Sequence, residues 1–126
     1  KIILVAIAYA IGAHGIMTLN DFKALKGDKA LGINSLPVQL GPERAAKIAC
    51  YVMAIPQILV VTFLFAWGLT TFSIFILLLV IGQILAMRRL LSDPEKFAPW
   101  YNSTGVLMFV SGMMVCALGL SQAVAQ

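Results

Sequence analysis

Four long apolar runs, each almost free of charge, constrain this chain more than any other feature. They cover residues 2–19, 48–69, 72–87 and 103–123. A hydrocarbon core of about 30 Å is crossed by about 20 helical residues, so each run has about the length of one membrane span. Strands are excluded, because the runs do not alternate and an open sheet leaves unpaired backbone groups in lipid. We therefore expect an all-α integral membrane fold with four transmembrane helices.

The composition agrees with a surface that faces lipid. Hydrophobic residues make up 61% of the chain and charged residues 11%, whereas soluble domains have about 45–50% and about 25%. We expect the lipid bilayer to be the main partner of this surface, and we expect no nucleic-acid binding.

The charges lie almost entirely in two of the three connections, residues 20–47 and 88–100, whereas the link at 67–71 has none. These two connections hold eight of the nine basic residues: Lys23, Lys26, Lys29, Arg44, Lys47, Arg88, Arg89 and Lys96. Loops rich in Lys and Arg stay in the cytoplasm. The first span is thus predicted to run toward the cytoplasm, and both charged connections to be cytoplasmic loops.

The first charged connection carries the residues best suited to chemistry. Directly after the first span stand two carboxylates, Asp21 and Asp28, and three lysines at positions 23, 26 and 29. Carboxylates bind Mg²⁺ together with phosphate oxygens, and lysines bind the remaining phosphate charge. This pattern predicts a Mg²⁺–diphosphate site at the membrane surface. Composition alone also permits an ordinary cytoplasmic loop, in which the lysines only set the membrane orientation and the acids only aid solubility.

The spacing of the two acids constrains such a site. In one continuous helix, Asp21 and Asp28 would lie about 10 Å apart along the axis and could not bind one ion. Either the chain turns near Gly27, or the two acids serve different ions.

Residues 20–41 read NDFKALKGDKALGINSLPVQLG. This run resembles the second Asp-rich motif of the chlorophyll and bacteriochlorophyll synthases, a family within the UbiA prenyltransferase superfamily. The stretches YAIGAHGIMTL (9–19) and DPEKFAPWYNSTG (93–105) resemble the bacterial members in particular. The resemblance implies a bundle of nine transmembrane helices, of which this chain would be the last four. The family's first Asp-rich motif is not in this chain, so we expect a C-terminal part with half of an active site.

The resemblance also implies an activity, the esterification of bacteriochlorophyllide with geranylgeranyl or phytyl diphosphate, with Mg²⁺ as cofactor. Asp21 and Asp28 would be the catalytic, Mg²⁺-binding acids, and Asn20, Lys23 and Lys29 would contact the diphosphate. Lys26 departs from the family pattern, in which an acid often stands at this position. We therefore expect Lys26 to bind phosphate or simply to be solvated, rather than to bind a metal.

The same resemblance implies a bacterial inner membrane, or an intracytoplasmic photosynthetic membrane, where other pigment-synthesis or photosynthetic proteins would be neighbours. Two alternatives stay open. One is a related prenyltransferase for a quinone or haem precursor, and the other is a non-catalytic, synthase-like membrane subunit of a photosynthetic complex.

Single residues inside the spans add further candidates. His14, the one histidine, lies seven residues before Asp21, and an ionisable residue within a membrane helix is a functional candidate. It would contact the tetrapyrrole, or else bond to a neighbouring helix. Tyr9, on another face, would flank the prenyl chain or pack in the core. Asn102 and Ser103 are predicted to cap the last helix.

Overall fold

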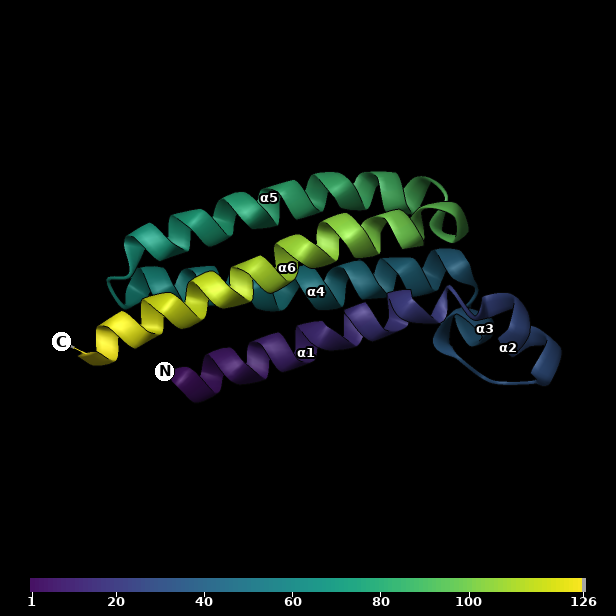
Figure 1. The fold of residues 1–126 in the computed structure, drawn as a ribbon, viewed down its shortest axis with the longest axis horizontal. Helices are drawn as coiled ribbons and strands as arrows, with labels where there is room; N and C mark the ends of the chain where they lie inside the picture. Colours follow the sequence, from purple (N-terminus) through teal and green to yellow (C-terminus); the bar gives the residue numbers. More distant parts are fainter. Residues whose placement is uncertain (126) are drawn as a thin grey trace.

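A computed structural model describes residues 1–125, and all of the regular structure in this range is helical. The elements in chain order are α1 (Ile2–Asp21), α2 (Leu25–Leu31), α3 (Leu36–Leu40), α4 (Pro42–Ala66), α5 (Thr70–Ser92) and α6 (Pro94–Ala125). The four long helices run antiparallel to their neighbours in sequence, and the short helices α2 and α3 lie at the end opposite the two termini (Figure 1).

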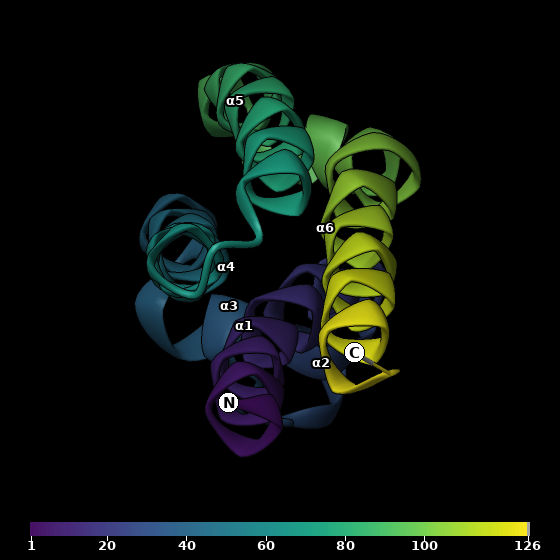
Figure 2. The same cartoon turned by 90° about the vertical axis from the view of Figure 1, so that its left-hand side faces the viewer.

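The helices α1, α4, α5 and α6 are each long and apolar enough to cross a membrane, which confirms the predicted fold class. Seen from the end that carries the termini, they form a four-helix arrangement (Figure 2). α4 packs against both α1 and α5, and α6 packs mainly against α5. The charged connections therefore meet at one end of the bundle, as the charge pattern predicts.

Three of the four helices extend well beyond the predicted apolar runs. α4 begins at Pro42 rather than at residue 48, α5 continues to Ser92, and α6 begins at Pro94 rather than at residue 103. Proline is favoured in the first turn of a helix, where its missing N–H needs no partner. The apolar pattern marks only the part in lipid, because a helix continues into the polar interface without needing apolar residues.

The prediction of a loop over residues 88–100 was therefore wrong, since Asp93 alone separates α5 from α6. The Asp93 carboxylate accepts a hydrogen bond from the Lys96 backbone N–H at 3.2 Å, which caps the start of α6. The predicted caps, Asn102 and Ser103, lie inside α6 instead, and the Ser103 hydroxyl donates to the Trp100 carbonyl at 2.9 Å. The predicted loop over 20–47 likewise contains α2, α3 and the start of α4.

Small residues let the helices approach closely. On α4, Ala45, Ala46 and Ala49 are fully buried, and Gly15 of α1 lies so close to this helix that a Cβ there would be 2.7 Å from the Ala49 carbonyl oxygen. Lipid supplies no hydrophobic force between helices, so dense packing of small residues contributes much of their association.

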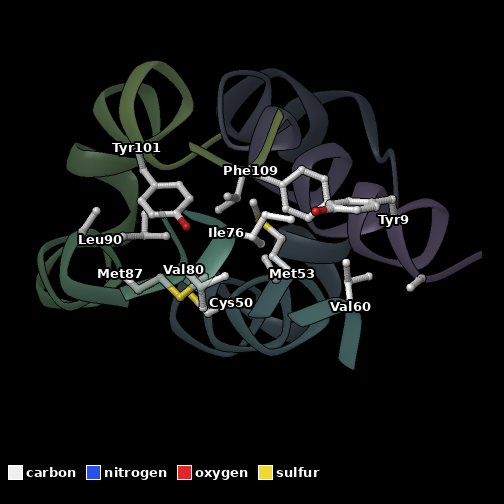
Figure 3. Packing of buried hydrophobic residues seen from close by; sticks show 14 of the residues in the cluster. Tyr9, Cys50, Met53, Val60, Ile76, Val80, Met87, Leu90, Tyr101 and Phe109 are labelled. Atoms are coloured by element: carbon white, nitrogen blue, oxygen red, sulfur yellow. The ribbon is translucent and has the colours of Figure 1, made fainter. Parts of the chain in front are cut away.

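Larger side chains fill the centre of the bundle. The Tyr9 and Phe109 rings meet edge to face with centroids 5.4 Å apart, and Figure 3 shows both within a cluster that includes Met53 and Ile76. On α6, a Cβ at Gly119 would lie 2.8 Å from Cγ of the Phe72 ring. This contact supports helix packing as a role of the glycines in α6.

One polar pair lies inside this apolar core. Gln57 of α4 donates through Nε2 to Oε1 of Gln83 of α5 at 2.7 Å, and both side chains are almost fully buried. A buried polar group without a partner costs about 1–3 kcal/mol, so the bond to Gln57 stabilises the buried Gln83 amide, while Gln57 Nε2 also donates to the Met53 carbonyl at 3.3 Å. The pair therefore links α4 to α5 within the core.

Gly15→Ala should loosen the packing of α1 on α4, because the new methyl group would lie 2.7 Å from the Ala49 carbonyl oxygen. The backbone moves out of such a clash less easily than a flexible side chain does. We therefore expect the free energy of unfolding to fall by about 1–3 kcal/mol. Gly27→Ala is the matched control, because a Cβ there meets nothing within 4 Å. Thermal unfolding of each variant in detergent measures the difference, and equal Tm values would contradict the close approach.

Gln57→Leu should destabilise the bundle by about 1–3 kcal/mol, because the Gln83 amide would be left buried without a partner. Adding Gln83→Leu should cost less than the sum of the two single changes, with a coupling of about 0.6–1.7 kcal/mol. Unfolding of the single and double variants in detergent completes the cycle. Strictly additive losses would show that the two amides act independently.

Candidate functional site at the charged end of the bundle

The segment that carries the predicted site folds back over the end of α1. α1 ends at Asp21, and two backbone hydrogen bonds close the turn that follows, from Lys23 N–H to the Asn20 carbonyl at 3.1 Å and from Ala24 N–H to the Asp21 carbonyl at 3.0 Å. Phe22 and Leu25 are buried, so burial of these two apolar side chains holds the turn against the bundle.

This turn corrects the expectation about Gly27, which lies inside α2. Of the two geometries considered, the chain does turn between the acids, but it does so at residues 22–24. Asp21 is half-buried at the end of α1, and Asp28 is half-buried within α2. The two carboxylates therefore come from different elements.

The predicted diphosphate contacts are all accessible. Asn20, Lys23 and Lys29 are exposed, with Asn20 in the last turn of α1 and Lys29 in the last turn of α2. The Asn20 Oδ1 accepts a hydrogen bond at 3.2 Å from Nδ2 of Asn102, which lies on α6. Sequence reasoning missed this role of Asn102, because its polar side chain after a proline was interpreted as a helix cap.

A cavity of about 950 Å³ opens at the same end of the molecule. Four basic side chains and three acidic side chains line it: Lys23, Lys26, Arg44, Lys96, Glu43, Asp93 and Glu95. Asp21 and Asp28 are not among its lining residues. The structure thus places Lys23 and Lys26 on this cavity and does not bring all of the predicted site residues around it.

Asp21 and Asp28 carry the kind of oxygen ligand that Mg²⁺ prefers. Among residues 1–125, no group of three or more His, Cys, Asp or Glu side chains is placed to hold a metal. Mg²⁺, however, is usually bound by only one or two carboxylates, with water and phosphate oxygens completing its shell. Asp21 and Asp28 can supply those carboxylates, and the amide of Asn20 adds a neutral polar group beside Asp21.

The second cavity is an apolar groove of about 730 Å³ between the first half of α1 and the second half of α6. Tyr9 lines it, and the buried Tyr9 hydroxyl has no hydrogen-bond partner among the residues that the structure describes. His14 does not line this groove; it is exposed on α1. Tyr9 thus lies at the groove and His14 on the exposed surface of α1, as expected for residues on different faces of one helix.

The sequence is similar to one protein family and to several proteins of known name. The UbiA prenyltransferase family matches residues 1–113 of the chain. Over 119 residues, or 94% of the chain, it is 58% identical to the bacteriochlorophyll synthase 33 kDa chain of Cereibacter sphaeroides. The corresponding chain of Rhodobacter capsulatus is 54% identical over the same length.

A more distant relative is the chloroplastic chlorophyll synthase of Oryza sativa, which is 36% identical over 121 residues, or 95% of the chain. The alignments span 39% of each bacterial relative and 32% of the rice protein. No solved structure matches the chain at a significant level. With a family match across most of its length, this multi-pass membrane chain belongs to the UbiA prenyltransferase family.

Proposed function

We propose that this chain is part of a prenyltransferase that esterifies bacteriochlorophyllide with geranylgeranyl or phytyl diphosphate. One observation carries the proposal. The acidic and basic segment after α1 folds over the polar end of a membrane bundle, in a chain 58% identical to a bacteriochlorophyll synthase subunit. A polar cap above apolar helices suits a substrate with a charged head and a hydrocarbon tail.

In the proposed reaction, the bond between the allylic carbon and the diphosphate oxygen breaks, and the diphosphate leaves with the electron pair. A propionate carboxylate of bacteriochlorophyllide attacks the same carbon and forms the ester. Mg²⁺, when bound, would offset the negative charge of the leaving diphosphate.

The residues of this chain would serve the leaving group. Asp21 and Asp28 would hold the metal, and Asn20, Lys23 and Lys29 would donate hydrogen bonds to diphosphate oxygens. Such donors stabilise charge as it develops in the transition state. The exposure of Asn20, Lys23 and Lys29 supports this role, since a charged ligand must be able to reach them.

The apolar parts of the substrates would lie toward the membrane. Tyr9 lines the groove between α1 and α6, whose residues are nearly all apolar, so it would contact the prenyl hydrocarbon. His14, about 10 Å from Asp21 by helical rise, would contact the tetrapyrrole. Both assignments depend on the proposed substrates.

We place the charged end in the cytoplasm and the protein in the bacterial inner or intracytoplasmic photosynthetic membrane. The eight basic residues of the two charged connections support this orientation. The active-site segment would then meet soluble prenyl diphosphate and Mg²⁺ from the cytoplasm.

Asp28→Asn in the complete enzyme should reduce turnover about 100-fold or more while leaving the protein in the membrane, because an amide binds Mg²⁺ far more weakly than a carboxylate. Glu43→Gln is the control, since it neutralises an exposed acid at the same end of the bundle. Prenyl transfer by purified variants is the measurement. Activity of Asp28→Asn within about threefold of wild type, less than about 1 kcal/mol, would remove Asp28 from the metal site.

Lys26→Cys should react with a membrane-impermeant thiol reagent only from the cytoplasmic side, and Thr70→Cys only from the opposite side. The reason is that residue 26 lies in a basic connection, whereas residue 70 lies in the uncharged link at 67–71. The native cysteines, Cys50 and Cys116, are buried and give the background in unsubstituted protein. Labelling of both positions from one side would contradict the topology.

A further inference from the structure

A hydrogen bond joins the candidate site to a helix far away in sequence. Asn102 of α6 donates through Nδ2 to Oδ1 of Asn20, 3.2 Å away and 82 residues earlier. Asn20 is exposed and Asn102 is half-buried. The contact therefore ties the last turn of α1, directly before Asp21, to the beginning of α6.

Asn102 itself is held firmly by its neighbours. Tyr101 is fully buried, and its ring packs against Gly105 of the same helix. The Trp100 ring lies under the Arg89 guanidinium, whose carbon is 4.6 Å from the ring centroid. Trp100 and Tyr101 thus anchor α6 directly before residue 102 and fix the backbone from which the Asn102 amide reaches Asn20.

The direction of this hydrogen bond matters for an anionic ligand. An asparagine side chain ends in one accepting oxygen and one donating NH₂ group. Diphosphate oxygens only accept, so Asn20 aids a diphosphate only when its NH₂ group faces the ligand. When Asn102 donates to the Asn20 oxygen, that oxygen is occupied and both N–H groups of Asn20 remain free to donate.

Without Asn102, the Asn20 amide could rotate and present its oxygen to the anion. The Asn102 Oδ1 atom is buried and has no partner among residues 1–125. Its one hydrogen bond to another side chain in this part of the protein is thus the one to Asn20. As long as Asn102 donates in this bond, the Asn20 oxygen is turned toward α6 and not toward a ligand.

We infer that Asn102 is a positioning residue for prenyl-diphosphate binding, because its amide holds the Asn20 side chain with the NH₂ group toward the diphosphate. This inference rests on the proposed function and adds to it a residue on α6. Asn102 acts through Asn20 and does not need to touch the substrate.

A double-mutant cycle in the complete enzyme tests the inference. The variants are Asn20→Ala, Asn102→Leu and the two combined, and the KM for prenyl diphosphate and for bacteriochlorophyllide is measured for each. Asn102→Leu should raise the prenyl-diphosphate KM about tenfold, the scale of one lost hydrogen bond to a charged group. The bacteriochlorophyllide KM should change less than about twofold, far below the scale of such a bond.

The combined variant should have the same prenyl-diphosphate KM as Asn20→Ala alone, because Asn102 has nothing left to orient. Asn102→Asp keeps the size of the side chain but can only accept, so it should bind prenyl diphosphate no better than Asn102→Leu. Ser103→Ala is the control: within the described part of the chain, the exposed Ser103 hydroxyl bonds only to the Trp100 carbonyl. The kinetics of this variant should match wild type.

The outcomes separate the inference from the proposed function. If Asn20→Ala raises the KM and Asn102→Leu adds a further, independent increase, Asn102 does not act through Asn20 and the inference fails. It also fails if Asn102→Leu and Asn102→Asp reduce only the amount of folded protein. If Asn20→Ala leaves the prenyl-diphosphate KM unchanged, the proposed diphosphate contact fails as well.

Discussion

The absence of water around most of this chain is the constraint on which the rest of the structure depends. In lipid, every backbone N–H and carbonyl needs a partner within the protein, and a helix meets that need by itself. Polar side chains in the bundle must then find partners on other helices, as Gln57 and Gln83 do at 2.7 Å. Apart from Lys1, the charged side chains are placed at one end of the bundle, and the candidate site lies there.

Close packing follows from the same constraint. Because lipid tails are as apolar as the helix surfaces, contact area between helices is gained through small residues rather than through burial from water. Gly15 against Ala49 and Gly119 against Phe72 are contacts of this kind. They lie between α1 and α4 and between α6 and α5.

The sequence predicted the four spans because uninterrupted apolar runs are a direct consequence of the lipid environment. It did not predict the ends of the helices, since α4 and α6 begin in polar segments at Pro42 and Pro94. Hydropathy does not report these starts. Proline in the first turn and the Asp93 cap were the available signals, but the same residues are common in loops.

The residue types of the candidate site could be predicted from the sequence, but their arrangement could not. Asp21 and Asp28 stand out by charge, yet the turn between them depends on the burial of Phe22 and Leu25 against the bundle. The contact between Asn20 and Asn102 joins positions 82 residues apart, and no local pattern indicates it. Such pairs follow from tertiary packing alone.

The central claim is that the segment after α1 binds Mg²⁺ together with a prenyl diphosphate. An anomalous difference map of the complete protein, with Mn²⁺ in place of Mg²⁺ and a non-reactive prenyl diphosphate analogue, tests it most directly, since Mn²⁺ accepts the same oxygen ligands. The account predicts a metal peak in direct contact with a carboxylate oxygen of Asp21 or Asp28 and with the diphosphate. A metal and diphosphate bound with neither carboxylate in contact would contradict it.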